Sequence, residues 1–153
     1  MNTLLFFHSL FRWLVLGSLL YAIYRSYRGY FNDTPFTKTD DRVRHWTATI
    51  THVQLLLGIG LYTQSDTVKA LFRGPSGGGH ITEPVFFGMI HISLMLTAII
   101  VVTIGSAKAK RLLFAHEKFK VMLLSFSIAL ILIFLAIPWP FSPLAHRPYL
   151  RSF

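Results

Sequence analysis

Pro84–Ile104 reads PVFFGMIHISLMLTAIIVVTI, a run of 21 residues without a single Asp, Glu, Lys or Arg. The hydrocarbon core of a bilayer is about 30 Å thick, and a helix of about 20 apolar residues crosses it. A helix satisfies its own backbone hydrogen bonds in lipid, and the alternation typical of a membrane β-barrel strand is missing here. The stretch is therefore predicted to be a transmembrane helix.

The composition of the whole chain agrees with a membrane protein. Of its 153 residues, 53% are hydrophobic and only 14% are charged, whereas soluble domains carry about 25% charged residues. Cysteine is absent, which excludes disulfides, thiolate metal sites, iron–sulfur clusters and covalent c-type haem. The net charge of +9 is typical of basic ends on membrane helices, so we expect no nucleic-acid partner.

Three more segments extend the pattern. They are Leu4–Tyr24, His45–Tyr62 and Phe119–Pro138. His45–Tyr62 is the least apolar of them, so its polar half should face the bundle interior. Leu4–Tyr24 lacks the basic start and the cleavage site of a signal peptide, and we expect it to be retained. The sequence thus predicts an all-α integral membrane protein whose 153 residues form one up-down bundle of four transmembrane helices.

The distribution of Lys and Arg predicts the orientation of this bundle. The basic residues near the two connections after the first and third predicted spans are Arg25, Arg28, Lys38, Arg42, Arg44, Lys108, Lys110, Arg111, Lys118 and Lys120. The opposite side has only Lys69, Arg73, Arg147 and Arg151. Basic loops stay in the cytoplasm. Both termini are therefore expected on the periplasmic side of a bacterial inner (cytoplasmic) membrane.

Three of the predicted spans contain a histidine: His8, His52 and His91. Ionisable residues inside a membrane are expensive and are usually functional. With a rise of about 1.5 Å per residue, His8 and His91 lie roughly 8–10 Å below the outer surface, and His52 lies deeper. Helices one and three of such a bundle are diagonal, so His8 and His91 can approach one haem iron from opposite faces. The alternative is that each histidine only forms hydrogen bonds to a neighbouring helix.

Arg12 lies four residues after His8, so both side chains project from one face of the first helix. A cation at this depth is costly unless it meets an anion, and no Asp or Glu lies within any predicted span, since Glu83 is at the outer start of one helix and Glu117 at the inner start of another. A haem propionate is one candidate partner. Snorkelling of the arginine toward backbone carbonyls or water is the alternative.

The remaining histidines indicate a function less clearly. A second haem would need His45 and His116 at the cytoplasmic level, where a surface position explains both residues equally well. His52 is either an alternative axial ligand to His91 or a neighbour of the haem ring. His80 and His146 belong to outer segments and are expected to be solvated.

Four segments resemble small bacterial four-helix membrane proteins that are labelled cytochrome b. These are residues 7–13 (FHSLFRW), 44–52 (RHWTATITH), 87–91 (FGMIH) and 137–143 (IPWPFSP). The resemblance covers nearly the whole chain and implies b-type haem and electron transfer. The chain departs from the di-haem cytochrome b pattern, in which one helix carries two ligands about four turns apart, because His45 and His52 are only two turns apart.

Together these features predict a bundle that holds one haem b between His8 and His91, with Arg12 toward a propionate. It would pass electrons between membrane quinol and a partner within a larger respiratory assembly, as an electron-transfer subunit rather than a stand-alone enzyme. A quinol-oxidising site at His45 or His116 is an extension of this hypothesis. The alternatives are a cofactor-free membrane subunit or assembly factor, and a copper- or zinc-handling protein that uses His8, His52 and His91.

Overall fold

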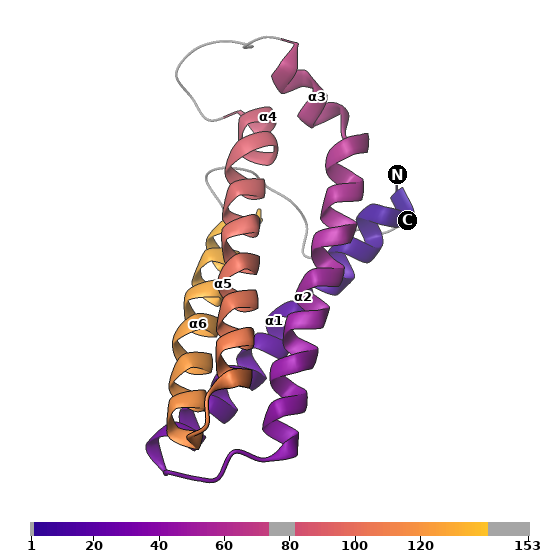
Figure 1. The fold of residues 1–153 in the computed structure, drawn as a ribbon. Helices are drawn as coiled ribbons and strands as arrows, with labels where there is room; N and C mark the ends of the chain where they lie inside the picture. Colours follow the sequence, from indigo (N-terminus) through magenta and orange to yellow (C-terminus); the bar gives the residue numbers. More distant parts are fainter. Residues whose placement is uncertain (1, 74–81, 141–153) are drawn as a thin grey trace.

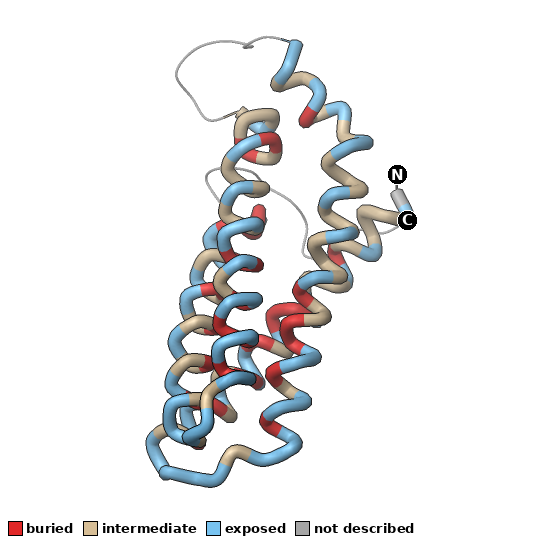
Figure 2. Tube along the Cα trace, in the orientation of Figure 1, coloured by how far each residue is buried: buried red, intermediate tan, exposed pale blue. Residues whose placement is uncertain are grey.

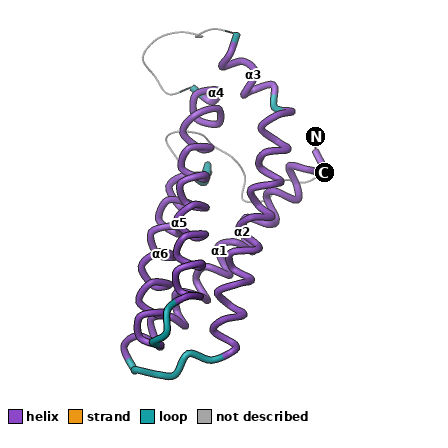
Figure 3. The backbone as a smooth tube through the Cα atoms, in the orientation of Figure 1, coloured by secondary structure: helices purple, strands orange, loops and turns teal. Residues whose placement is uncertain are grey.

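The structure is a computed structural model and describes residues 2–73 and 82–140. Within these ranges every regular element is a helix (Figure 3). The elements are α1 (Asn2–Phe31), α2 (Lys38–Gln64), α3 (Asp66–Phe72), α4 (Glu83–Val85), the π-helix η1 (Phe86–His91), α5 (Ile92–Arg111) and α6 (Ala115–Ala136). Because α4, η1 and α5 follow one another without a break, they form a single long helical segment.

The long helices form a closed ring of neighbours. α1 packs against α2 and α6, and α5 packs against the same two helices. This arrangement leaves α1 diagonally opposite α5, and α2 diagonally opposite α6. The connections 32–37 and 112–114 lie together at one end of the bundle, and α3 and α4 lie at the other (Figure 1).

Three helical segments are long and apolar enough to cross a membrane: Thr3–Phe31, Glu83–Arg111 and Ala115–Ala136. They contain the first and third predicted spans and most of the fourth. The other predicted span, His45–Tyr62, lies in α2, which has 27 residues but is not among these candidates. Its apolar residues are interspersed with threonines, His52 and Gln54, which lower its mean hydropathy. The described residues therefore indicate a multi-pass membrane protein with three candidate spans.

The core lies between the inward faces of α1, α5 and α6, with Ala48 of α2, and reaches from Ala109 near the two connections to Ile137 at the far end of α6. Buried positions occur along the length of the bundle (Figure 2). Its fully buried side chains include Leu19, Val102, Phe119, Met122 and Phe126. Helices α5 and α6 come close at Gly105, where a Cβ atom would collide with the side chain of Ser125. A residue without a side chain is therefore required at this crossing, as is common between membrane helices.

We expect Gly105→Ala to destabilise the protein by about 1–3 kcal/mol, because the methyl group overpacks the contact with Ser125. Unfolding in mixed detergent micelles, followed by circular dichroism, measures the effect. Gly17→Ala is the matched control, since a Cβ there meets nothing within 4 Å. Alanine also raises helix propensity at that position by about 1 kcal/mol. Equal destabilisation by both substitutions would contradict the steric explanation.

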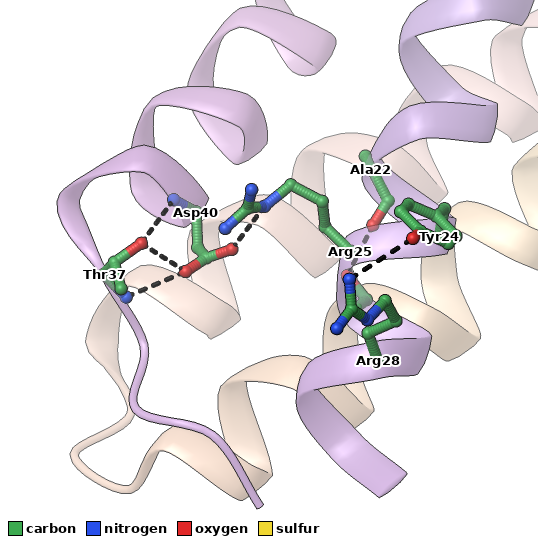
Figure 4. A network of polar contacts seen from close by, with 7 residues as sticks. Ala22, Tyr24, Arg25, Arg28, Thr37 and Asp40 are labelled. Atoms are coloured by element: carbon green, nitrogen blue, oxygen red, sulfur yellow. Dashed lines mark hydrogen bonds and ion pairs between the residues drawn. The ribbon is translucent and has the colours of Figure 1, made fainter. Parts of the chain in front are cut away.

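A buried carboxylate joins the first two long helices near the basic end (Figure 4). Asp40 accepts a hydrogen bond of 2.7 Å from Nε of Arg25 and one of 2.8 Å from the backbone N–H of Thr37. The Thr37 hydroxyl also contacts this carboxylate, and Thr37 and Asp40 form the capping box that begins α2. Burial alone would raise the pKa of Asp40, but the hydrogen bonds from Arg25 and Thr37 outweigh it and hold the pKa below its ordinary value.

Arg44 makes a second polar link, between α2 and α5. Its guanidinium is buried and donates to the Ser106 side chain at 2.8 Å and to the Ser106 carbonyl at 3.2 Å. It also pairs with Asp41 at 2.8 Å, one turn earlier on α2. These bonds satisfy the charge within the protein, so Arg44 is a structural residue as well as one of the cations at this end.

Candidate functional site

A cavity of about 280 Å³ lies in the half of the bundle opposite the basic connections. Its walls come from α1, α2, α3, the η1–α5 segment and the end of α6. Most lining residues are apolar, but polar ones are also present, and the larger of these are His8, Arg12, Gln54, Tyr62 and His91. A mainly apolar cavity with a few placed polar groups is the usual form of a ligand or cofactor site.

The imidazoles of His8 and His91 approach each other in the interior in a T-shaped, edge-on arrangement. Their ring centroids are 6.5 Å apart and the ring planes make an angle of 65°. The two residues come from α1 and from the end of η1, which are separated by 83 positions in the sequence. The structure therefore brings together the pair for which the sequence predicted equal depth.

The ring of His91 is held in a defined tautomer. Its Nδ1 lies 2.8 Å from the carbonyl oxygen of Ala136, at the end of α6. A carbonyl only accepts, so Nδ1 carries the hydrogen and Nε2 keeps its lone pair. A histidine that binds a metal commonly donates its other ring N–H to a backbone carbonyl in this way. His91 is thus prepared to act as a ligand through Nε2.

The backbone around His91 is also unusual. His91 ends the π-helix η1, and π-helical turns inside α-helices occur frequently at functional sites. The hydroxyl of Tyr62 donates to the carbonyl of Gly88 within this turn at 3.1 Å. Gly88 also lies against α3, since a Cβ there would be 2.7 Å from Cδ2 of Leu71. Contacts from Tyr62 on α2 and Leu71 on α3 therefore hold the π-helical turn in place.

His8 is oriented by α2. Nε2 of Gln54 donates to the His8 carbonyl at 3.0 Å and lies 3.4 Å from the imidazole Nε2. Within the described residues, Nδ1 of His8 and Oε1 of Gln54 are buried atoms without a hydrogen-bond partner. A buried polar atom in this state costs free energy, so such atoms often mark a functional position. Gly58 lies beside the ring, where a Cβ would be in van der Waals contact with Cε1 of His8, at 3.4 Å.

Arg12 lines the same cavity, one turn along α1 from His8. Its Nη2 lies 3.5 Å from the Ser9 hydroxyl, and its guanidinium carbon is 5.6 Å from the centre of the Trp13 ring. The arginine therefore brings positive charge to the cavity wall near both imidazoles.

The other predicted histidines lie elsewhere. His52 is exposed, and its Nε2 is 3.0 Å from the Thr103 hydroxyl on α5, outside the cavity lining. His45 packs against Trp46, while His116 contacts Asp33 at 2.8 Å and stacks on Tyr30. Among the described residues, no three His, Cys, Asp or Glu side chains come together as a metal-binding group. His80 and His146 lie outside the described residues.

No protein-family model, curated protein or solved structure matches this chain. The functional interpretation therefore depends on the residues and geometry of the cavity.

Sequence reasoning did not single out Gln54, Tyr62 or the Ala136 carbonyl. A signal for the first two was present: Thr47, Thr51, Gln54, Gly58 and Tyr62 recur at intervals of three or four along α2. This spacing places polar and small residues on one helix face. The role of the Ala136 carbonyl has no such signal, because every residue carries a backbone carbonyl.

Proposed function

We propose that this chain is a b-type haem protein of the bacterial cytoplasmic membrane and that it transfers electrons. His8 and His91 would be the axial ligands of a single haem. The observation that carries the proposal is the pair of imidazoles in one cavity, from two different helical segments and 6.5 Å apart between ring centroids.

The separation of the two rings fits such a ligand pair. Two imidazoles bound to opposite sides of one metal ion, with bonds of about 2 Å each, have ring centroids about 6 Å apart. The orphaned Nδ1 of His8 and the apolar walls agree with a flat, largely apolar group between the rings. When bound, haem with two protein ligands supplies one-electron transfer and leaves no open position at the iron.

Under this proposal, each polar group around the cavity has a role. The Ala136 carbonyl fixes the His91 tautomer, and Gln54 positions His8 through its backbone and ring. Arg12 would face the anionic propionates, for which a guanidinium is a suitable donor. The apolar walls keep water away from both imidazoles.

The finer topology belongs to the same proposal. α2 would form a fourth span with its polar face inside the bundle, and both termini would lie in the periplasm. A membrane quinol would supply the electrons, and a protein partner in a respiratory assembly would accept them. The separate contacts of His45 and His116 favour one haem over two.

The chief alternative is a cofactor-free membrane subunit, and one observation favours it. His8, His52 and His91 each contact a polar group on another helix, which is the role that this alternative assigns to them.

One experiment separates the two functions. The protein is expressed with added haem precursor and purified in detergent, and reduced-minus-oxidised spectra, haem content and bound metals are measured. The proposal expects b-type bands, one haem per chain, iron, and no stoichiometric copper or zinc. Colourless protein without iron would overturn it and support the cofactor-free alternative, while stoichiometric copper or zinc would support a metal-handling role.

A further inference from the structure

The turn between α5 and α6 exposes large apolar side chains at the basic end of the bundle. Leu113 is 88% exposed and Phe114 is 69% exposed, and they lie two and three residues after Arg111, which follows Lys108 and Lys110. A turn in water favours small polar residues. Apolar side chains beside cations are instead typical of a segment at a membrane surface.

A groove of about 360 Å³ lies beside this turn. It is lined by Ile104, Ala107, Lys108, Arg111 and Leu112. The first four recur at intervals of three, one and three residues, so they share one face of α5. Their order runs from apolar to charged over about 10 Å of helix. The groove therefore has an apolar part toward the membrane interior and a cationic part at its edge.

The two cations of the groove have no carboxylate partner within the described residues, where neither Lys108 nor Arg111 forms an ion pair. This distinguishes them from Arg25 and Arg44, which pair with aspartates in the same half of the protein. Cations are favourable at the last turn of any helix. That effect explains their charge but not the apolar groove or the exposure of Leu113 and Phe114.

We propose that this groove binds an anionic phospholipid of the cytoplasmic leaflet. Lys108 and Arg111 would hold the phosphate, and an acyl chain would follow Ile104 and Ala107 toward the membrane interior. Leu113 and Phe114 anchor the turn at the boundary between headgroups and acyl chains. Basic pockets on the cytoplasmic side of membrane helices bind acidic headgroups by the same chemistry. The site is independent of the cavity at the other end of the bundle.

The test compares two charge-matched double variants of the full chain. K108Q/R111Q removes both cations of the groove, and K110Q/K120Q removes two exposed cations outside it. Binding of phosphatidylglycerol is measured by native mass spectrometry from micelles, with phosphatidylcholine as the neutral lipid. We expect K108Q/R111Q to lower phosphatidylglycerol affinity about thirty-fold, and K110Q/K120Q to change it less than about three-fold.

Three results would overturn the proposal: equal loss in both variants, no loss in either, or equal binding of the neutral lipid. Glycerol phosphate in excess should not displace the lipid, and displacement would show that the acyl groove is not used. Circular dichroism confirms that both variants are folded, and K108Q alone, with a smaller loss expected, provides a milder change. Retention of phosphatidylglycerol by K108Q/R111Q together with loss of a copurifying protein would assign the surface to a protein partner instead.

Discussion

Under the proposed function, His91→Ala is expected to abolish the b-type absorption of the purified protein, and His8→Ala to do the same. Each substitution removes one of the two imidazoles that lie close together in the cavity. A haem with a single protein ligand is bound much less tightly, so we expect less than about a tenth of the wild-type haem to remain. Haem per chain is measured by the pyridine haemochrome spectrum.

His52→Ala is the matched control for both substitutions. His52 also lies in a predicted span and also contacts another helix, but its partner is Thr103 and it does not line the cavity. We expect this variant to keep its full haem content. Undiminished bands in His91→Ala would exclude it as an axial ligand. Equal loss in His52→Ala would show that haem content reports overall destabilisation and not ligation.

The relation between His8 and His91 was predictable because it depends on quantities that hold for any helix. A constant rise per residue converts sequence position to depth, and short connections make successive long helices antiparallel. The prediction that His52 lies deeper and close to the ring is a different case. The direction of the His52 side chain depends on how α2 is rotated about its own axis. Its contact with Thr103 places this side chain toward the outside of α5.

Two features near His91 could not be predicted from the sequence and are seen only in the structure. The π-helix adds a residue to one turn and changes the direction of the side chains that follow it, and FGMIH has no residue that demands it. His91 donates its orienting hydrogen bond to the carbonyl of Ala136 at the end of α6, 45 positions later in the chain. This hydrogen bond forms because α6 ends next to η1. Such contacts follow from packing and not from a local pattern.

The second predicted span shows the limit of hydropathy in a bundle. α2 has the least lipid-like composition because it carries the polar groups that the interior uses: Thr47 and Thr51 are buried, and Gln54 orients His8. The predicted start of this span also differs from the observed start of the helix. The sequence prediction began the span at His45, but the capping box at Thr37 begins the helix seven residues before that position, at Lys38. A helix thus extends beyond its apolar part wherever caps and ion pairs stabilise the added turns.

Asp40→Asn is expected to destabilise the bundle by about 2–4 kcal/mol, because breaking a buried ion pair leaves the other charge without its partner. Arg25 is partly exposed, which reduces the cost, and Asn retains part of the capping interaction with Thr37. Asp66→Asn is the control, since its pair with Lys69 is exposed and such pairs contribute less than about 1 kcal/mol. Unfolding in detergent, followed by circular dichroism, measures both.

The same carboxylate predicts an acid-dependent loss of stability. The pKa of Asp40 in the folded protein is below its ordinary value, so the unfolded chain takes up a proton first as the pH falls. The stabilisation by the ion pair is therefore complete above the unfolded pKa of about 4 and declines as the pH falls through the lower folded pKa. Wild-type protein should lose stability in this window, and Asp40→Asn should lose correspondingly less. If both proteins showed the same slope below about pH 4, the acid sensitivity would come from other carboxylates and not from the link between α1 and α2.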